Sequence, residues 1–205
     1  WHGRDTGLKS YRSVVFESLP RTGIPPQFPS YAAYRSYVEM LLTTGSLEEP
    51  SHIWWDVRPS ERFATLEVRI PDSCTRLDET LCLAALVQAI IAKLVRLRMA
   101  NQSWRIYPRH LLDENKWRAV RYGIEDELID FGKSEEVRFP ILIEELVNWL
   151  DDVLDDLGSR AEIEYVDTIL SQGASADRQL AVWRRTGDFR AVVDHVVEET
   201  QAGLW

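Results

Sequence analysis

The sequence has few cysteines and no long apolar stretch. Only Cys74 and Cys82 occur in 205 residues, with no CxxC motif and no Cys/His pair at zinc spacing, which argues against a disulfide framework or a structural zinc. The longest apolar run, residues 81–95, is interrupted by Gln88 and Lys93 and falls short of the roughly 20 apolar residues of a membrane span. We therefore expect a cytoplasmic protein with no membrane partner, in which this run forms a buried helix.

Acidic residues outnumber basic residues in this chain. The chain has 24 Lys and Arg against 33 Asp and Glu, a formal charge of −9, which argues against nucleic acid as a partner. A hydrophobic content of 45% with eight Trp suffices for a folded core. The chain opens at Trp1 with neither an initiator Met nor an apolar leader, and we expect further sequence to precede it.

The first 44 residues divide into a loop and a helix. Residues 1–30 are rich in Gly and Pro, which predicts a long ordered loop. Ser30 is a typical helix cap, and apolar residues such as Tyr34 and Val38 follow at helical spacing until Gly45. This pattern predicts an amphipathic helix.

Two strands are expected next, over residues 53–58 and 63–70, joined by the four residues 59–62. A simple antiparallel register then places Arg58 opposite Phe63. Strand alternation puts the polar side chains on one face: Trp54, Asp56, Arg58, Thr65, Glu67 and Arg69. The other face is apolar, with Trp55, Val57, Ala64, Leu66 and Val68, and the helix after Thr75 is expected to pack on it.

The rest of the chain is expected to be helical. Thr75 and Asp78 have the spacing of a capping box and open a helix that reaches about Met99. After Pro108 the pattern predicts helices to about residue 122 and over 140–157, then two or three shorter ones, the last capped by Asp188. The expected fold class is α+β, an antiparallel hairpin backed by helices with a mainly helical C-terminal region.

The polar face of the hairpin has two interpretations. It is either a solvent-exposed surface of mixed charge or a site for Mg·ATP. Glu67 can give an oxygen ligand to Mg²⁺, and Arg69 and Arg58 offer planar donors to phosphate oxygens. Neighbouring positions on one strand face are about 7 Å apart, close enough to reach one metal-phosphate unit.

The stretch IWWDVRPSERFATLEVRIPDSCTR, residues 53–76, resembles the carboxylate-amine ligase (type 2 glutamate-cysteine ligase) family, whose members carry a W-D-[IV]-R-P-S-x-x-[FY]-x-T-[LV]-E-[IV]-R-x-x-D run. Weaker similarities are DTGLKSYRS, PRTGIPP, LCLAALVQAIIA and RAVRYGIED. The resemblance implies a glutamine-synthetase-like catalytic sheet on which ATP, with Mg²⁺, phosphorylates a carboxylate, usually the γ-carboxylate of glutamate. An amine such as cysteine, or another amino compound, then displaces phosphate.

The resemblance also implies roles for single residues. The E-x-R pair corresponds to Glu67, as the metal ligand, and Arg69, near the transferred phosphoryl group. Arg58 is a candidate for catalysis and ATP contact and Arg12 for substrate contact, although each is equally well explained as a buried structural ion pair. Trp54 either shapes the wall of the nucleotide pocket or simply packs.

Asp56 and Asp72 are expected to orient arginines or to cap the end of the hairpin. Two family motifs, a G-x-E-x-E strand that binds metal and an H-V-H-[VI]-G strand, do not occur. We therefore interpret residues 1–205 as the C-terminal half of a ligase catalytic domain, in three parts. These are an active-site loop region (1–30), a helix–hairpin–helix part (31–106) and a helical part (107–205).

The missing motifs also predict a partner, the N-terminal half of the same enzyme. The chain is then a subunit that joins a separate polypeptide, a product of truncation or cleavage, or a segment of a longer chain. We expect the assembled enzyme to form a homo-oligomer. The alternative function is a non-catalytic assembly or regulatory subunit that retains the ligase fold.

Overall fold

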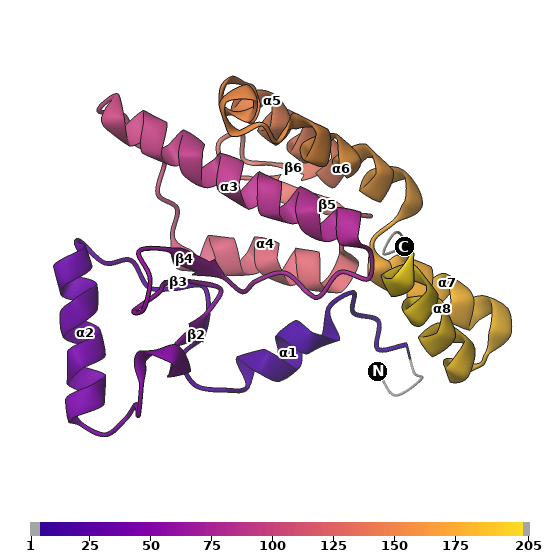
Figure 1. The fold of residues 1–205 in the computed structure, drawn as a ribbon, viewed down its shortest axis with the longest axis horizontal. Helices are drawn as coiled ribbons and strands as arrows, with labels where there is room; N and C mark the ends of the chain where they lie inside the picture. Colours follow the sequence, from indigo (N-terminus) through magenta and orange to yellow (C-terminus); the bar gives the residue numbers. More distant parts are fainter. Residues whose placement is uncertain (1–4, 203–205) are drawn as a thin grey trace.

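The computed structural model describes residues 5–202, which form helices and three two-stranded sheets (Figure 1). The α-helices are α1 (Tyr11–Glu17), α2 (Tyr31–Thr43), α3 (Leu77–Met99), α4 (Arg109–Tyr122), α5 (Phe139–Leu157), α6 (Arg160–Gln172), α7 (Ser175–Thr186) and α8 (Phe189–Gln201). The strands are β1 (Thr22–Gly23), β2 (Trp54–Trp55), β3 (Val57–Pro59), β4 (Leu66–Val68), β5 (Glu127–Asp130) and β6 (Glu135–Arg138). The expected α+β class is confirmed. Residues 1–4, at the start of the predicted N-terminal loop, lie outside the described part.

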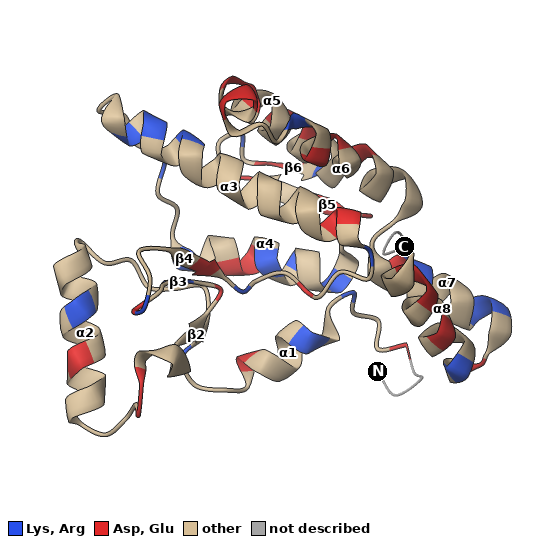
Figure 2. Cartoon of the chain, viewed as in Figure 1, with Lys and Arg blue, Asp and Glu red and all other residues tan. Residues whose placement is uncertain are grey.

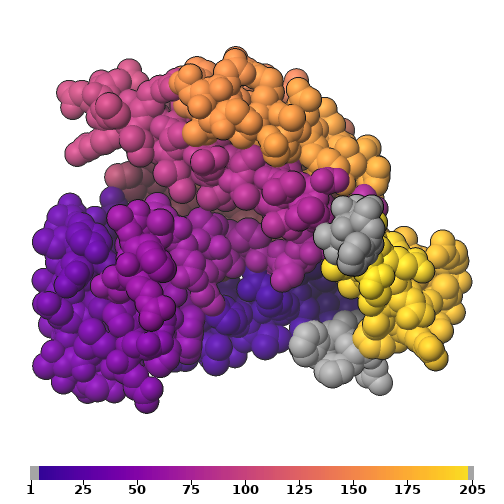
Figure 3. Space-filling model, viewed as in Figure 1, coloured from indigo at the N-terminus to yellow at the C-terminus, as the bar shows by residue number. Residues whose placement is uncertain are grey.

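Two separate apolar cores hold these elements together. The larger core joins α3, α5 and α6 through Ala85, Ala89, Leu150, Val153, Leu154 and Ile163. The smaller core joins α2 to β2 through Tyr34, Val38, Leu47, Ile53 and Trp55. Figure 1 shows α2 at the opposite end of the molecule from α7 and α8, and in the space-filling view the α7–α8 pair projects from one end (Figure 3).

Several helices begin where the sequence predicts. The Ser30 side chain accepts a hydrogen bond from the backbone N–H of Ala33 at 3.1 Å, and Asp188 accepts one from the N–H of Arg190 at 2.9 Å. These caps satisfy backbone donors that have no partner within the helix. The predicted helix ends near residues 122 and 157 and the three short C-terminal helices are confirmed.

Helix α3 differs from its prediction in two ways. Its N-cap is Arg76, which makes no side-chain cap hydrogen bond, so the predicted capping box at Thr75 is wrong. The helix is also not largely buried, because only 17% of its most apolar 18-residue stretch is buried. By length and composition alone α3 could cross a membrane, since the mean hydropathy of that stretch is 1.9. One face packs on α5 and α6, and apolar residues of the other face, among them Leu81 and Val95, are exposed.

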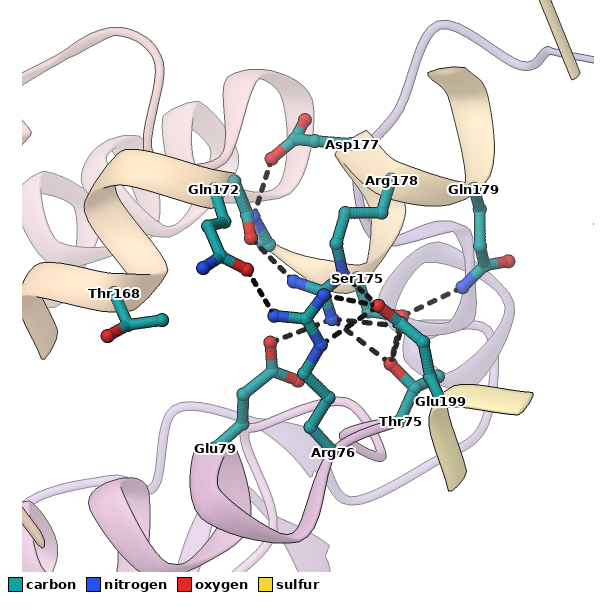
Figure 4. A network of polar contacts seen from close by, with 12 residues as sticks. Thr75, Arg76, Glu79, Thr168, Gln172, Ser175, Asp177, Arg178, Gln179 and Glu199 are labelled. Atoms are coloured by element: carbon teal, nitrogen blue, oxygen red, sulfur yellow. Dashed lines mark hydrogen bonds and ion pairs between the residues drawn. The ribbon is translucent and has the colours of Figure 1, made fainter. Parts of the chain in front are cut away.

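Thr75 has a different role, in a buried polar network (Figure 4). Its hydroxyl donates to Glu199 at 2.7 Å. Arg178 lies 2.7 Å from Glu79 and donates from Nε to Glu199 at 2.6 Å, and Arg76 donates to Glu199 at 2.9 Å. Paired charges satisfy one another where an unpaired buried charge is costly. The network therefore fastens α7 and α8 to the start of α3.

Helix α1 and strands β1, β5 and β6 were not predicted. The Gly- and Pro-rich segment 1–30 contains α1, whose Ser10 side chain accepts from the N–H of Ser13 at 3.3 Å. The region after Pro108 contains the β5–β6 hairpin, so the expectation that it is all helical is wrong. The Asn115 side chain on α4 bonds to both the N–H and the C=O of Ile129, at 2.8 and 2.9 Å. This tertiary contact is invisible in the local pattern.

Candidate functional site

In the β3–β4 hairpin Arg58 and Glu67 share one face, as predicted, but the register differs from the predicted one. Arg58 pairs with Glu67 and Val57 with Val68, whereas the simple loop placed Arg58 opposite Phe63. The connection is longer than the four residues expected, because the strands are shorter and end at Pro59 and Leu66. The shift is an even number of residues, so the polar side chains remain on one face. The apolar face meets α2 through Trp55 rather than α3.

Arg58 and Glu67 form the centre of this polar face. Arg58 Nη2 donates to Glu67 Oε2 at 2.7 Å, and Nη1 donates to the backbone oxygens of Ile53 and Pro50 at 2.9 and 3.1 Å. Arg58 therefore forms the structural ion pair that was the alternative to a role in catalysis. Hydrogen bonds from Arg58, and then from Arg69, outweigh partial burial and lower the pKa of Glu67. The Glu67 carboxylate is therefore ionised at neutral pH.

Arg69 is held from several sides. Its backbone N–H donates to the C=O of Asp56 at 2.7 Å, and its guanidinium lies 5.9 Å from the centre of the Phe16 ring. The buried Nε of Arg69 has no hydrogen-bond partner among residues 5–202. A buried donor left unpaired is costly, and a bound anion would satisfy it.

Arg12 and Asp72 form a pair at the end of the hairpin. Arg12 on α1 donates to the Asp72 carboxylate and to the backbone oxygens of Ile70 and Pro71, the latter two at 2.9 and 3.1 Å. Asp72 orients an arginine, as predicted. The pair is exposed, with both side chains 42% exposed, and is therefore not the buried ion pair of the alternative for Arg12. The contact fixes α1 against the exit of β4.

Lys116 was not found from the sequence. It lies on α4, and its ammonium is 2.9 Å from Asp56 Oδ2 and 2.8 Å from Glu17 Oε1. Burial opposes the charged form, but the hydrogen bonds to Glu17 and Asp56 outweigh it and raise the pKa of Lys116. Asp56 thus orients a lysine and not an arginine. No local spacing connects Lys116 with the hairpin, because α4 reaches the site only through tertiary packing.

These residues surround a narrow pocket, which we call the Arg69 pocket. It is lined by Arg12, Ser13, Phe16, Glu17, Gly23, Trp54, Asp56, Arg69, Ile70 and Lys116. Of the predicted site residues, Arg12, Trp54 and Arg69 line it, whereas Arg58 and Glu67, which pair with each other on the hairpin, do not. The pocket therefore presents three cations beside two aromatic rings. Figure 2 shows basic and acidic residues interspersed along the neighbouring α4.

Gly23, the last residue of the PRTG segment (residues 20–23), also lines the pocket. Arg21 of the same segment has a positive φ of 60°, which is uncommon for a non-glycine residue, and Gly23 has a φ of 82°. The backbone oxygens of Arg21 and Gly23 accept from the N–H groups of Trp54 and Asp56, both at 2.9 Å. This pairing of β1 with β2 ties the segment to the hairpin.

The donor set fits a phosphate or carboxylate better than it fits a metal alone. No group of three or more His, Cys, Asp or Glu that could hold a metal ion occurs within residues 5–202. Glu67 holds two guanidinium groups, yet a carboxylate has about four lone-pair sites and could still offer one to a cation. A Mg²⁺ ion at Glu67 would need further oxygen ligands from phosphate, water or another polypeptide segment.

Comparisons with known proteins identify the family of this chain. The sequence matches glutamate-cysteine ligase family 2 (GCS2) over residues 1–195. It is 50% identical over 204 residues to a protein of Herpetosiphon aurantiacus, 49% over 205 residues to one of Solibacter usitatus, and 50% over 212 residues to one of Rhodospirillum rubrum, each named "Putative glutamate--cysteine ligase 2". All of this chain is covered, with 53%, 53% and 54% of those proteins. The chain thus spans about half the length of the curated relatives it matches, and it belongs to glutamate-cysteine ligase family 2.

Proposed function

We propose that this chain forms one half of the active site of a ligase that joins the γ-carboxylate of glutamate to an amine, either cysteine or another amino compound. In this reaction, which depends on ATP and Mg²⁺, the γ-phosphoryl group of ATP passes to the carboxylate and gives an acyl phosphate and ADP. The amine then displaces phosphate and loses a proton. The observation that supports the proposal is the unpartnered Nε of Arg69, in a pocket also lined by Arg12 and Lys116.

Such chemistry needs fixed positive charge more than a protein nucleophile, because phosphoryl transfer depends on positioning and on neutralising negative oxygens. Arg69 would donate to the transferred phosphoryl group, and Arg12 would contact the substrate carboxylate. Trp54 would form the wall beside the nucleotide. Glu67 would hold Mg²⁺, which supplies further charge neutralisation, while Arg58 keeps Glu67 in place and offers a second guanidinium.

We further propose that the remaining half of the relatives' length pairs with this chain. That half would extend the β3–β4 hairpin into a glutamine-synthetase-like sheet and supply the other metal ligands. Apolar side chains around β4 support this arrangement, since Phe63, Leu66 and Ile70 are exposed by 66%, 50% and 45%. Two strands are too few for a stable sheet alone, and exposed apolar patches commonly mark interfaces.

The test is phosphate release by the full-length protein with ATP, Mg²⁺, glutamate and an amine. We expect Arg69→Ala and Glu67→Gln to reduce turnover by about 10²-fold or more. Arg62→Ala removes an exposed arginine from the loop of the same hairpin and should leave turnover near wild type. Equal rates in all three variants would refute the assigned roles.

Calorimetry separates this proposal from the non-catalytic alternative. A ligase binds Mg·ATP, and Arg69→Ala should weaken that binding. If the full-length protein shows no binding of Mg·ATP by calorimetry, it is instead an assembly or regulatory subunit.

A further inference from the structure

A second cavity lies directly beside the Arg69 pocket, between α1 and α4. This α1–α4 cleft has a volume of about 320 Å³ and is lined by Val14, Glu17, Thr22, Gly23, Arg109, Asp113, Lys116, Trp117 and Val120. Glu17, Gly23 and Lys116 also line the Arg69 pocket. A small molecule in the cleft is therefore separated from the Arg69 pocket only by these shared residues. The volume is at the lower end of the range for small-molecule sites, about 300–1,000 Å³.

Charges of both signs line the cleft. Arg109 and Asp113, one helical turn apart on α4, have side chains 54% and 49% exposed and only 3.5 Å between their charged atoms. An exposed pair of this kind is worth little by itself, so either partner can turn to a ligand at small cost. Glu17, half-exposed, faces the same cleft and pairs with Lys116, whose side chain is 12% exposed.

The remaining wall is apolar. Trp117 is 50% exposed although it is a large aromatic residue, and it lines the cleft together with Val14 and Val120. A ligand that fits these surfaces has an ammonium group for a carboxylate, a carboxylate for Arg109, and a short apolar side chain for the Trp117 wall. A small α-amino acid combines these three features.

We propose that the α1–α4 cleft binds the amine substrate, a small α-amino acid. This inference rests on the proposed ligase function and names the subsite for its second substrate. Arg109 holds the α-carboxylate, and Asp113 and Glu17 hold the ammonium. An amine bound there lies next to the pocket in which the acyl phosphate forms, with Lys116 between the two sites.

The kinetic test uses the full-length enzyme with Arg109→Gln and Asp113→Asn. The matched controls are Arg118→Gln and Glu114→Gln, because Arg118 and Glu114 form the same i, i+4 pair on α4, 3.2 Å apart, but do not line the cleft. We expect the cleft variants to raise KM for L-cysteine about tenfold or more and to leave KM for ATP and glutamate unchanged. The controls should change none of these constants. Cleft variants that behave like the controls, or that raise all three KM values alike, overturn the proposal.

A binding test does not depend on turnover. Ligand-observed NMR with L-2-aminobutyrate, which has the size of cysteine but no thiol, should show binding to the wild type and to Arg118→Gln and not to Arg109→Gln. Arg109→Lys keeps the positive charge and should retain part of the binding. It provides a second test if Arg109→Gln proves unstable. Binding that depends on Arg109 in a protein that makes no amide supports the cleft and refutes the ligase. Amide formation with binding that ignores Arg109 refutes the cleft alone.

Discussion

Lys116 joins the two cavities and is also a structural contact. Its side chain is 12% exposed and its ammonium contacts Asp56, which is 15% exposed. Lys116→Met leaves the largely buried Asp56 carboxylate without its cation, and an unpaired buried polar group costs about 1–3 kcal/mol. We expect the free energy of unfolding, measured in urea, to fall by about that amount.

A second change at Asp56 tests this explanation. Asp56→Asn in the Lys116→Met background should recover part of the loss, because the charge left unpaired is then gone. Lys133→Met removes a lysine whose side chain is 48% exposed and should alter stability by no more than about 0.5 kcal/mol. A Lys116 variant as stable as the Lys133 variant would show that the buried pair contributes nothing.

Glu199 makes the stability of the protein depend on acid pH. Burial opposes its charge, but hydrogen bonds from Arg178, Thr75 and Arg76 outweigh burial and lower the pKa of Glu199 from 4.5 to about 2. A carboxyl group with a lowered pKa stabilises the fold above its unfolded pKa, and this contribution is lost as pH falls through the folded value. We expect up to about 3 kcal/mol of stability to disappear between about pH 5 and pH 2.

Urea midpoints measured from pH 6 to pH 2.5 test the role of Glu199. Glu199→Gln should lower stability at pH 6 and flatten the acid dependence, since glutamine does not titrate. Glu198→Gln, at the next position on α8 and exposed, is the control. If Glu199→Gln keeps the wild-type slope, other carboxyl groups cause the acid dependence.

At the scale of single elements, α2 depends on its first residue. Ser30→Ala removes the side-chain acceptor for the N–H of Ala33, and loss of such a cap costs about 1 kcal/mol. Ser36→Ala changes an exposed serine inside the same helix and should be neutral or slightly stabilising, because alanine is the better helix former. Thermal unfolding compares the two. Equal midpoints would mean that the cap does not limit the stability of α2.

The sequence predicts those features that are local. Caps at Ser30 and Asp188 and the polar face of the hairpin follow from spacing alone, and the family resemblance adds the roles that we propose for Glu67 and Arg69. The predicted register was wrong because Pro59 and Leu66 form the last pair, so the loop spans residues 60–65 instead of 59–62. The local sequence pattern does not show where the pairing of the two strands ends.

The features that were missed depend on contacts between distant segments. Lys116 meets Asp56, 60 residues away, and the β5–β6 hairpin is fixed by Asn115 on α4. Thr75 has the spacing of a cap, but its hydroxyl bonds to Glu199, 124 positions later in the chain. Tertiary partners of this kind override local propensity, so only the three-dimensional structure identifies the complete pocket.

At the scale of the whole molecule, α3 has an apolar face that the described residues leave open. Four apolar residues of α3 are exposed: Leu77, Leu81, Val95 and Met99. Their spacings of 4, 14 and 4 residues place them on one side of the helix. Because the chain spans about half the length of its relatives, we propose that their remaining half covers this stripe. Leu81→Glu should then block co-purification of this chain with a polypeptide that corresponds to the remaining half.

The isolated chain provides the internal check on this prediction. Leu81 is already 45% exposed, so Leu81→Glu should change the stability of the chain alone by no more than about 0.5 kcal/mol. Thr80→Glu introduces the same charge at the neighbouring exposed position, about 100° around the helix, and should still co-purify. Association that survives Leu81→Glu would place the interface elsewhere, and the exposed residues around β4 would become the next surface to test.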